Sequence, residues 1–287
     1  MRVDLHSHTT ASDGSLCPSD LVESAAAAGI NVLGLTDHDT LAGLDEATQS
    51  AARCGVRLIP GLELSVLHHG RTLHFLCYGF DALSPALDRL TSMVDSRTAR
   101  ARCIVDDLAA LGAPIAWTRV RELAGGAIGR PHIAAALVEA GHARDIGDAF
   151  DRYLGEGQAA YRDAGRLDPA EAIRLVREAG GEAALAHPLS PRSKLDLDRI
   201  LPELLEAGLT GIEVYHSDHD RSATTRLERV AEDENLWWCG GSDFHGTPKP
   251  HIALGSTLVD ESVLQQGPFV SRSVMRSSAS RRHSNVT

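Results

Sequence analysis

Hydrophobic and polar positions along the chain form short apolar runs that alternate with alanine-rich helical stretches. The stretch 17–29 is typical of these helices, because Pro18 comes early and Gly29 closes it. The pattern predicts strands at 2–8, 31–39, 56–66, 71–80, 182–188, 210–217 and 236–245, with helices at 17–29, 41–55, 168–181, 198–208 and 221–235 between them.

Alternating strands and helices are typical of a mostly parallel sheet with right-handed crossovers. Only "LHHG" separates the strands at 56–66 and 71–80, and a tight polar loop with a glycine predicts a hairpin-like turn there. Because seven strands can be counted, a closed or nearly closed α/β barrel is favoured over an open sheet.

The strand signal fades between residues 84 and 155, where long helical stretches take its place. We therefore expect a discontinuous barrel made of 1–83 and 156–262. The segment 84–155 is expected to be a helical insertion that forms a lid over the substrate. The Ser/Arg-rich segment 263–287 shows no apolar period, and we expect it to be disordered.

Composition narrows the class of protein. The 287 residues are 43% hydrophobic but only 4% aromatic, which fits one large α/β domain better than a β-sandwich. The net charge of −11 argues against long nucleic acid as a partner. Scattered cysteines indicate a reduced, cytoplasmic protein, and no apolar run is long enough to span a membrane. No obligate protein partner is evident.

Imidazoles and carboxylates stand at the ends of all the predicted strands. They are His6, His8, Asp37, His38, Asp39, Glu63, His74, His187, Glu213, His216, Asp243 and His245. In βα barrels the active site lies at the carboxyl ends of the strands, so these groups are expected to converge on one cavity. A lone His74 or His187 is more often a core or loop histidine, but the joint pattern predicts a metal site.

Strand alternation supports this prediction. His6 and His8 point to the same face of their strand, and so do Asp243 and His245, so each pair can chelate an ion. Imidazole with carboxylate suits Zn²⁺, Mn²⁺ or Fe²⁺ rather than Ca²⁺.

Five stretches, "DLHSHTTASDG", "GLTDHDT", "GLELS", "AHP" and "GSDFH", resemble the motifs of the PHP (polymerase and histidinol phosphatase) family of metal-dependent phosphoesterases. The insertion and "GRPHIA" resemble the branch that contains nucleoside 3′,5′-bisphosphate phosphatases and a 5′-to-3′ exoribonuclease acting on short RNA. The resemblance implies a distorted (β/α)₇ barrel. It also implies hydrolysis of phosphate esters of small nucleotides, most of all nucleoside 3′,5′-bisphosphates, or release of 5′ nucleotides from short RNA.

The resemblance further implies three divalent ions, with manganese favoured and zinc, iron or magnesium as alternatives. The implied ligands are His6, His8 and Asp243 for the first ion, Glu63 as a bridge to the second, His74 and His187 for the second, and Asp13, His38 and His245 for the third. The attacking group is then a metal-bridging hydroxide held by Glu63, Asp243 and His187. Some members of the family have histidine at the Asp13 position.

Substrate contacts are predicted from residue type and position. Arg130 and His132 flank Pro131 at a helix start, where an anion is favoured and arginine can bind a second phosphate. Arg130 could instead cap its loop, and Tyr161 could face the cavity or only pack. Four further residues are left without an assigned role: His216 and His219, interpreted as site-edge or solvated, and Lys249 and His251, which could line the mouth.

Other readings stay open. An amidohydrolase barrel also begins with H-x-H, but its binuclear members commonly use a carboxylated lysine, and neither Lys194 nor Lys249 ends the third or fourth strand. A histidinol phosphatase is a third reading, which the insertion fits poorly. A non-catalytic PHP scaffold would have lost ligands, and none of the expected ones is missing.

Overall fold

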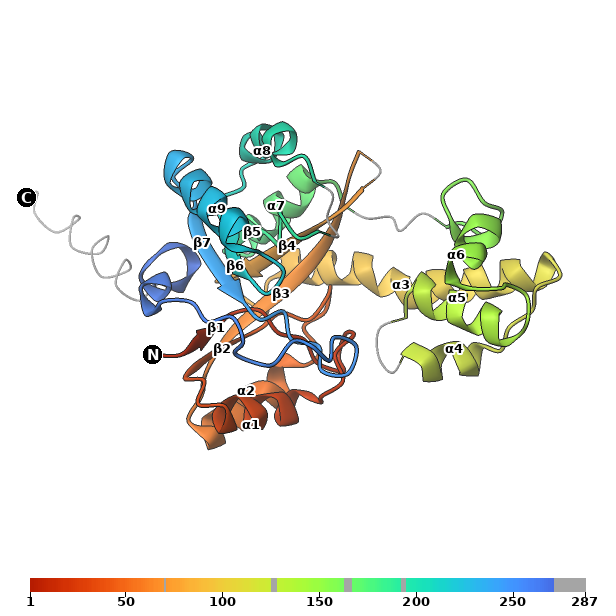
Figure 1. Ribbon diagram of the computed structural model, residues 1–287, viewed down its shortest axis with the longest axis horizontal. Coiled ribbons are helices and arrows are strands. Elements are labelled where there is room, and N and C mark those ends of the chain that lie inside the picture. The colour runs from red at the N-terminus through yellow and green to blue at the C-terminus, as the bar shows by residue number, and fades with distance from the viewer. Residues whose placement is uncertain (70, 125–127, 163–166, 192–194, 271–287) are drawn as a thin grey trace, which may run out of the picture.

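Seven strands form one sheet that closes into a barrel (Figure 1). The computed structural model describes residues 1–69, 71–124, 128–162, 167–191 and 195–270, with the backbone alone at 91–99. The strands are neighbours in chain order: β1 Val3–Asp4, β2 Val32–Leu35, β3 Arg57–His68, β4 Arg71–Tyr78, β5 Glu182–Leu185, β6 Gly211–His216 and β7 Trp237–Gly241. The two ends of the sheet meet where Leu5 N–H donates to Gly240 O at 3.1 Å and Asp243 N–H donates to His6 O at 2.9 Å. The predicted α/β barrel is confirmed.

β4 is the strand that runs against its neighbours. It forms the predicted hairpin with β3, in antiparallel register from Gly61 opposite Tyr78 to His68 opposite Arg71, and it is also antiparallel to β5. The other neighbouring pairs are parallel. Because β4 is reversed, its first half lies at the barrel end where the other strands finish. His74 reaches that end for this reason.

Helices cover the outside of the barrel. They are α1 Pro18–Ala27, α2 Leu44–Cys54, α7 Pro169–Glu178, α8 Leu197–Glu206 and α9 Arg221–Asp233. Figure 1 shows α1 and α2 on one side and α7, α8 and α9 on the other. Asp168 and Asp220 cap α7 and α9 by accepting from the backbone N–H of Glu171 and Ala223, and each such cap stabilises a helix by about 1 kcal/mol. Within the described residues, every helix is too short or too polar to span a membrane.

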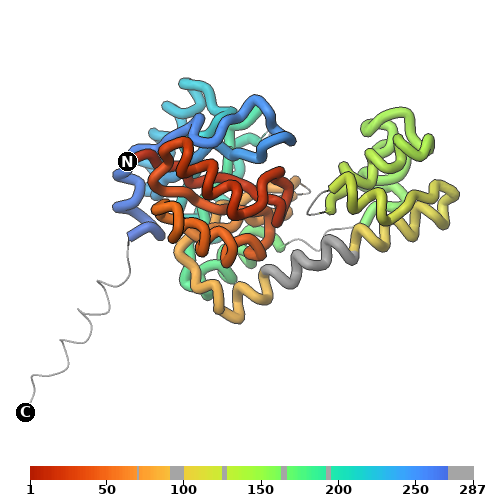
Figure 2. The backbone as a smooth tube through the Cα atoms, turned by 90° about the horizontal axis from the view of Figure 1, so that it is seen from below, coloured from red at the N-terminus to blue at the C-terminus, as the bar shows by residue number. Residues whose placement is uncertain are grey.

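The insertion consists of helices, as predicted. They are α3 Pro85–Ala110, α4 Trp117–Ala124, α5 Arg130–Glu139 and α6 Ile146–Ala149, and a π-helical turn, Phe150–Leu154, follows α6. Figures 1 and 2 show a lobe beside the barrel, into which α3 runs. The lobe has its own buried core, which includes Ile104, Leu108, Val120, Ile133, Leu137 and Leu154.

The prediction of disorder from residue 263 was wrong for its first part. Glu261–Gln265 and Gly267–Phe269 form 3₁₀ turns, and Val263 and Phe269 are buried. The Phe269 ring packs on Tyr78 and Trp237, with centroids 5.1 and 5.7 Å away. Two isolated buried side chains in 3₁₀ turns give no helix or strand period, so the pattern missed them. Residues 271–287 lie outside the described part of the chain.

Candidate metal centre

The predicted ligands converge at one end of the barrel. β1 leads directly into His6 and His8, and β7 leads into Asp243 and His245. The remaining predicted ligands are Asp13 in the loop before α1, His38 after β2, Glu63 in β3, His74 in β4 and His187 after β5. Most of these side chains are buried, and Asp13 is the most exposed of them at 39%. The structure therefore places them around one site at the strand ends.

His6, His8, Glu63 and Asp243 form the first group. The Nε2 atoms of His6 and His8 lie 3.1 Å apart, and Glu63 Oε2 lies 3.0 Å from each. Asp243 Oδ1 lies 3.3 Å from His6 Nε2 and 3.2 Å from His8 Nε2. Ligand atoms of all four residues lie within 4.8 Å of one another. Two imidazoles and two carboxylates that converge in a buried site match the donors of a transition-metal ion.

Glu63 faces two groups with its two oxygens. While Oε2 faces His6 and His8, Oε1 lies 2.8 Å from His74 Nδ1 and 2.9 Å from His187 Nε2. Glu63, His74 and His187 form the second group, and Glu63 belongs to both the first group and the second.

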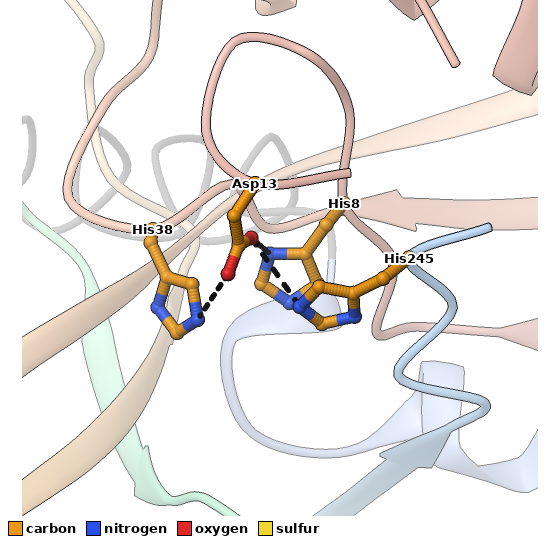
Figure 3. A group of neighbouring side chains, drawn as sticks. All are labelled: His8, Asp13, His38 and His245. Atoms are coloured by element: carbon orange, nitrogen blue, oxygen red, sulfur yellow. Dashed lines mark ion pairs between the residues drawn. The ribbon is translucent and has the colours of Figure 1, made fainter. Parts of the chain in front are cut away.

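His8, Asp13, His38 and His245 form the third group. Figure 3 shows Asp13 between His38 on one side and His8 with His245 on the other. Asp13 Oδ1 lies 3.3 Å from His245 Nε2, and Oδ2 lies 3.8 Å from His38 Nε2. The loop that carries Asp13 is anchored on Asp37, which accepts hydrogen bonds from Thr9 N–H at 2.7 Å and Ser12 Oγ at 2.6 Å.

Local backbone geometry adapts to the centre. Asp39, His187 and Asp243 have φ of 57°, 30° and 56°, a left-handed conformation that costs non-glycine residues energy and concentrates at functional sites. Gly241 permits a close approach, since a Cβ there would lie 2.4 Å from His6 N. The backbone around the centre thus departs from ordinary geometry at the residues that carry or adjoin its side chains.

The electrostatics fit a cation. Burial alone would lower the pKa of His8, but its hydrogen bonds to Asp243 and Glu63 outweigh this and raise the pKa to about 9. In His38 burial dominates and lowers the pKa to about 3, so this ring is neutral near pH 7 and can ligate. His38 Nδ1 is buried and has no hydrogen-bond partner among the described residues. An unpartnered imidazole nitrogen beside clustered carboxylates fits a bound divalent ion.

Comparison with known proteins identifies the family, because residues 4–156 match the family model of the PHP domain. The chain belongs to the PHP family. It is 38% identical over 262 residues to a 5′-3′ exoribonuclease of Haemophilus influenzae, covering 90% of this chain and 94% of that protein. It is 34% identical over 267 residues to a 3′,5′-nucleoside bisphosphate phosphatase of Chromobacterium violaceum, covering 89% and 91%.

A solved structure agrees with these relatives. A protein of Bifidobacterium adolescentis, assigned to the metal-dependent phosphoesterases, superposes with a TM-score of 0.76 at 33% identity, covering 92% of this chain and 94% of that one. This PHP protein is accordingly a metal-dependent phosphoesterase, an enzyme that hydrolyses phosphoric esters.

Glu213 lies directly behind the PHP centre and has no role in the set implied by the sequence. Its fully buried carboxylate holds two of the predicted ligands: Oε1 lies 2.9 Å from His6 Nδ1, and Oε2 accepts from His187 N–H at 2.6 Å. Charges of the surrounding histidines overcome the burial that would raise the pKa of Glu213, and lower it to about 2. The signal for this role was a carboxylate within a largely apolar, buried strand.

His216 and Lys249 also contact the PHP centre. His216 is only 5% exposed, and its Nε2 lies 3.1 Å from Asp243 Oδ2, so of the two readings, site-edge or solvated, the structure agrees with the first. Lys249 Nζ contacts the same oxygen. His219 is half-buried and its Nδ1 lies 2.9 Å from Val214 O, while His251 is exposed.

Two of the predicted substrate residues, Arg130 and His132, lie in the insertion, across a cleft from the metal centre. This insertion cleft, about 600 Å³, is lined by Asp13, His38 and His74 of the barrel and by Arg100, Arg130 and His132 of the lobe. Tyr161 is not among its lining residues; it contacts Arg130, whose guanidinium lies 5.2 Å from the Tyr161 ring centroid.

Proposed function

We propose that the enzyme binds three divalent ions, manganese by preference, and hydrolyses the 3′ phosphoester of small nucleotides that carry a 5′ phosphate. Nucleoside 3′,5′-bisphosphates and the 5′ ends of short RNA are the two substrates of this kind. The observation that carries the proposal is the insertion cleft, which connects Asp13 and His38 of the centre to Arg130 and His132. The names of two relatives, an exoribonuclease and a bisphosphate phosphatase, support the same substrates.

The three groups of side chains are proposed to hold one ion each. The assigned ligands are His6, His8 and Asp243 for the first ion, Glu63 with His74 and His187 for the second, with Glu63 also facing the first, and Asp13, His38 and His245 for the third. When bound, the ions supply positive charge to phosphoryl oxygens and lower the pKa of a bound water. Glu63, Asp243 and His187 are proposed to hold the attacking group, which would be a metal-bridging hydroxide.

Arg130 and His132 are proposed to bind the 5′ phosphate. The Arg130 guanidinium is oriented by a bond from Nη1 to Leu154 O at 3.1 Å and by the rings of Phe150 and Tyr161. His132 Nδ1 accepts from Gly129 N–H at 3.0 Å, and burial lowers the pKa of His132. The neutral ring therefore carries its proton on Nε2, which can donate to a phosphate at the start of α5. In this arrangement the insertion covers the substrate as a lid.

The size of the substrate and the cellular compartment are inferred from the net charge and from the cysteines. A net charge of −11 disfavours long nucleic acid, so the substrate is proposed to be a mononucleotide or a short oligonucleotide. Five free cysteines support a reducing, cytoplasmic location.

The test is a substrate panel with added Mn²⁺: nucleoside 5′-monophosphates, 3′-monophosphates, 3′,5′-bisphosphates and 5′-phosphorylated short RNAs, reading out phosphate and nucleotide release. We expect the bisphosphate and the short RNA to exceed both monophosphates by at least about tenfold in kcat/KM, as one lost charged contact predicts. Chelation should abolish activity and Mn²⁺ should restore it. Equal turnover of all monophosphates and bisphosphates would contradict the proposed function.

A further inference from the structure

A second cavity opens from the metal centre, and the residues that line it all belong to the barrel. This Asp218 pocket, about 280 Å³, is lined beyond the metal-centre residues by Leu73, Ala186, Ser190, Leu195, Asp218 and Lys249. It shares His38, Thr72 and His74 with the insertion cleft. The two cavities therefore adjoin at the metal centre, and a substrate can extend from the centre in two directions.

The two cavities differ in charge. The insertion cleft has Arg100, Arg130 and His132 on the wall facing the centre, which suits a phosphate. Among the described residues that line the Asp218 pocket, Lys249 contacts the carboxylate of Asp243, and the other charged group outside the metal centre is the carboxylate of Asp218. A carboxylate repels a second phosphate and accepts hydrogen bonds from hydroxyl groups.

The walls of the Asp218 pocket suit a sugar and a base. Leu73, Ala186 and Leu195 offer apolar surface. Asp218 accepts a hydrogen bond from Ser190 Oγ at 3.2 Å, which holds the carboxylate toward the loop after β5, and two carboxylate oxygens can accept further bonds. Its backbone N–H donates to His216 Nδ1 at 3.0 Å, which ties this residue to the centre.

We propose that the Asp218 pocket binds the nucleoside on the 3′ side of the scissile phosphate, with Asp218 accepting hydrogen bonds from its ribose hydroxyls. The inference rests on the proposed function and extends it, since a bisphosphate leaves this pocket empty and a phosphodiester fills both cavities. In the reaction, water adds to phosphorus and the P–O3′ bond breaks. The 3′ oxygen of the first nucleotide takes a proton, and the phosphate stays on the 5′ oxygen of the second. The shortened RNA thus keeps a 5′ phosphate, which the insertion cleft can bind in the next cycle.

The test compares three substrates with Mn²⁺: a nucleoside 3′,5′-bisphosphate, a 5′-phosphorylated diribonucleotide, and the same dinucleotide with a 2′,3′-dideoxy second nucleoside. In wild type, removing both hydroxyls should lower kcat/KM by about tenfold, the size expected for hydrogen bonds to a charged group. In Asp218→Ala, the two dinucleotides should become equal, and the ratio of diribonucleotide to bisphosphate turnover should fall. Asp198→Ala, at an exposed aspartate of α8, is the matched control and should behave as wild type.

The outcomes separate the two proposals. If wild type hydrolyses neither the bisphosphate nor the dinucleotide, the proposed function fails. If both are hydrolysed but loss of the hydroxyls has the same effect in wild type and Asp218→Ala, the Asp218 pocket does not read the ribose, although the proposed function stands. Should Asp218→Ala not fold, Asp218→Asn keeps the side-chain shape, removes the charge and should show a weaker form of the same coupling.

Discussion

The barrel end and the insertion hold their polar side chains in opposite ways. In the barrel, His6, Glu63 and Glu213 are at most 1% exposed and each contacts further polar groups on neighbouring strands. In the insertion, Arg130 and His132 are half-buried and extend from the first turn of one helix that packs on a separate apolar core. A closed sheet holds many polar side chains in fixed positions around one site, whereas the first turn of a helix brings only a few side chains to the cleft. The difference suggests that the barrel performs the chemistry and the lobe selects the substrate.

Substitutions can test this division of roles between the barrel and the lobe. Substitutions at the barrel end should change metal content and kcat, because they alter the groups around the phosphorus. Substitutions in the lobe should change KM for one substrate class and leave the metal content alone.

The largest effect is expected for Asp243→Ala. Asp243 lies within 3.3 Å of His6 and His8 and also contacts His216 and Lys249, so its removal leaves Glu63 as the one carboxylate of the first group. Loss of several kcal/mol of transition-state stabilisation should lower kcat by about 1,000-fold. Metal analysis of the purified protein should show at least one ion fewer per chain. An unchanged metal content together with wild-type turnover would remove Asp243 from the centre, and Asp198→Ala again serves as the control.

A smaller loss is expected for Asp13→Ala. Asp13 is the most exposed of the predicted ligands and supplies the carboxylate of the third group, so one ion should be lost while the first two stay. We expect kcat to fall by about 100-fold and the ion count per chain to fall by one. Circular dichroism should match wild type, since the loop is still held by Asp37. Full activity with Mn²⁺ would contradict a three-ion centre.

The barrel was predictable because its signals repeat. Each strand is a short apolar run, each is followed by a polar group, and closure of the barrel brings those ends together whatever their spacing in the chain. His74 shows the limit of this logic, since it sits in the first half of its strand and reaches the site only because β4 is reversed. Glu213 shows another: its role depends on contacts with His6 and His187 that no local pattern contains.

The insertion was predictable as helices but not as one wall of a cleft. Helical period and the proline at the start of α5 indicate the elements, yet the placement of Arg130 across from Asp13 depends on how the lobe lies beside the barrel. Tyr161 illustrates the same gap. Its sequence context allowed it to face the cavity or only to pack, and the structure places its ring against the Arg130 guanidinium.

Glu213→Gln tests whether the contacts that Glu213 makes with His6 and His187 contribute to metal binding in the barrel. His6 Nδ1 and His187 N–H contact different oxygens of Glu213, and glutamine replaces one of these oxygens by an NH₂ donor, so one of the two contacts is lost. Loss of such an outer contact typically costs about 10- to 100-fold in metal affinity, and we expect a reduction of that size in a chelator-competition titration with Mn²⁺. Glu228→Gln, at a carboxylate that binds the Tyr215 hydroxyl on the outside, is the matched control and should bind Mn²⁺ as wild type does. Equal affinities for the two variants would show that Glu213 only fills space.

The smallest and most selective effect is expected for Arg130→Ala. Its guanidinium faces the insertion cleft and makes no contact with the predicted ligands, so the metal content should be unchanged. Loss of a charged contact should raise KM for a nucleoside 3′,5′-bisphosphate by about tenfold and leave KM for a 3′-monophosphate as it was. Arg119→Ala, at an exposed arginine of the same lobe paired with Glu139, controls for general effects on the insertion. An equal rise in KM for both substrates would place Arg130 in the fold of the lobe rather than at the second phosphate, and the lobe would then lose its role in selection.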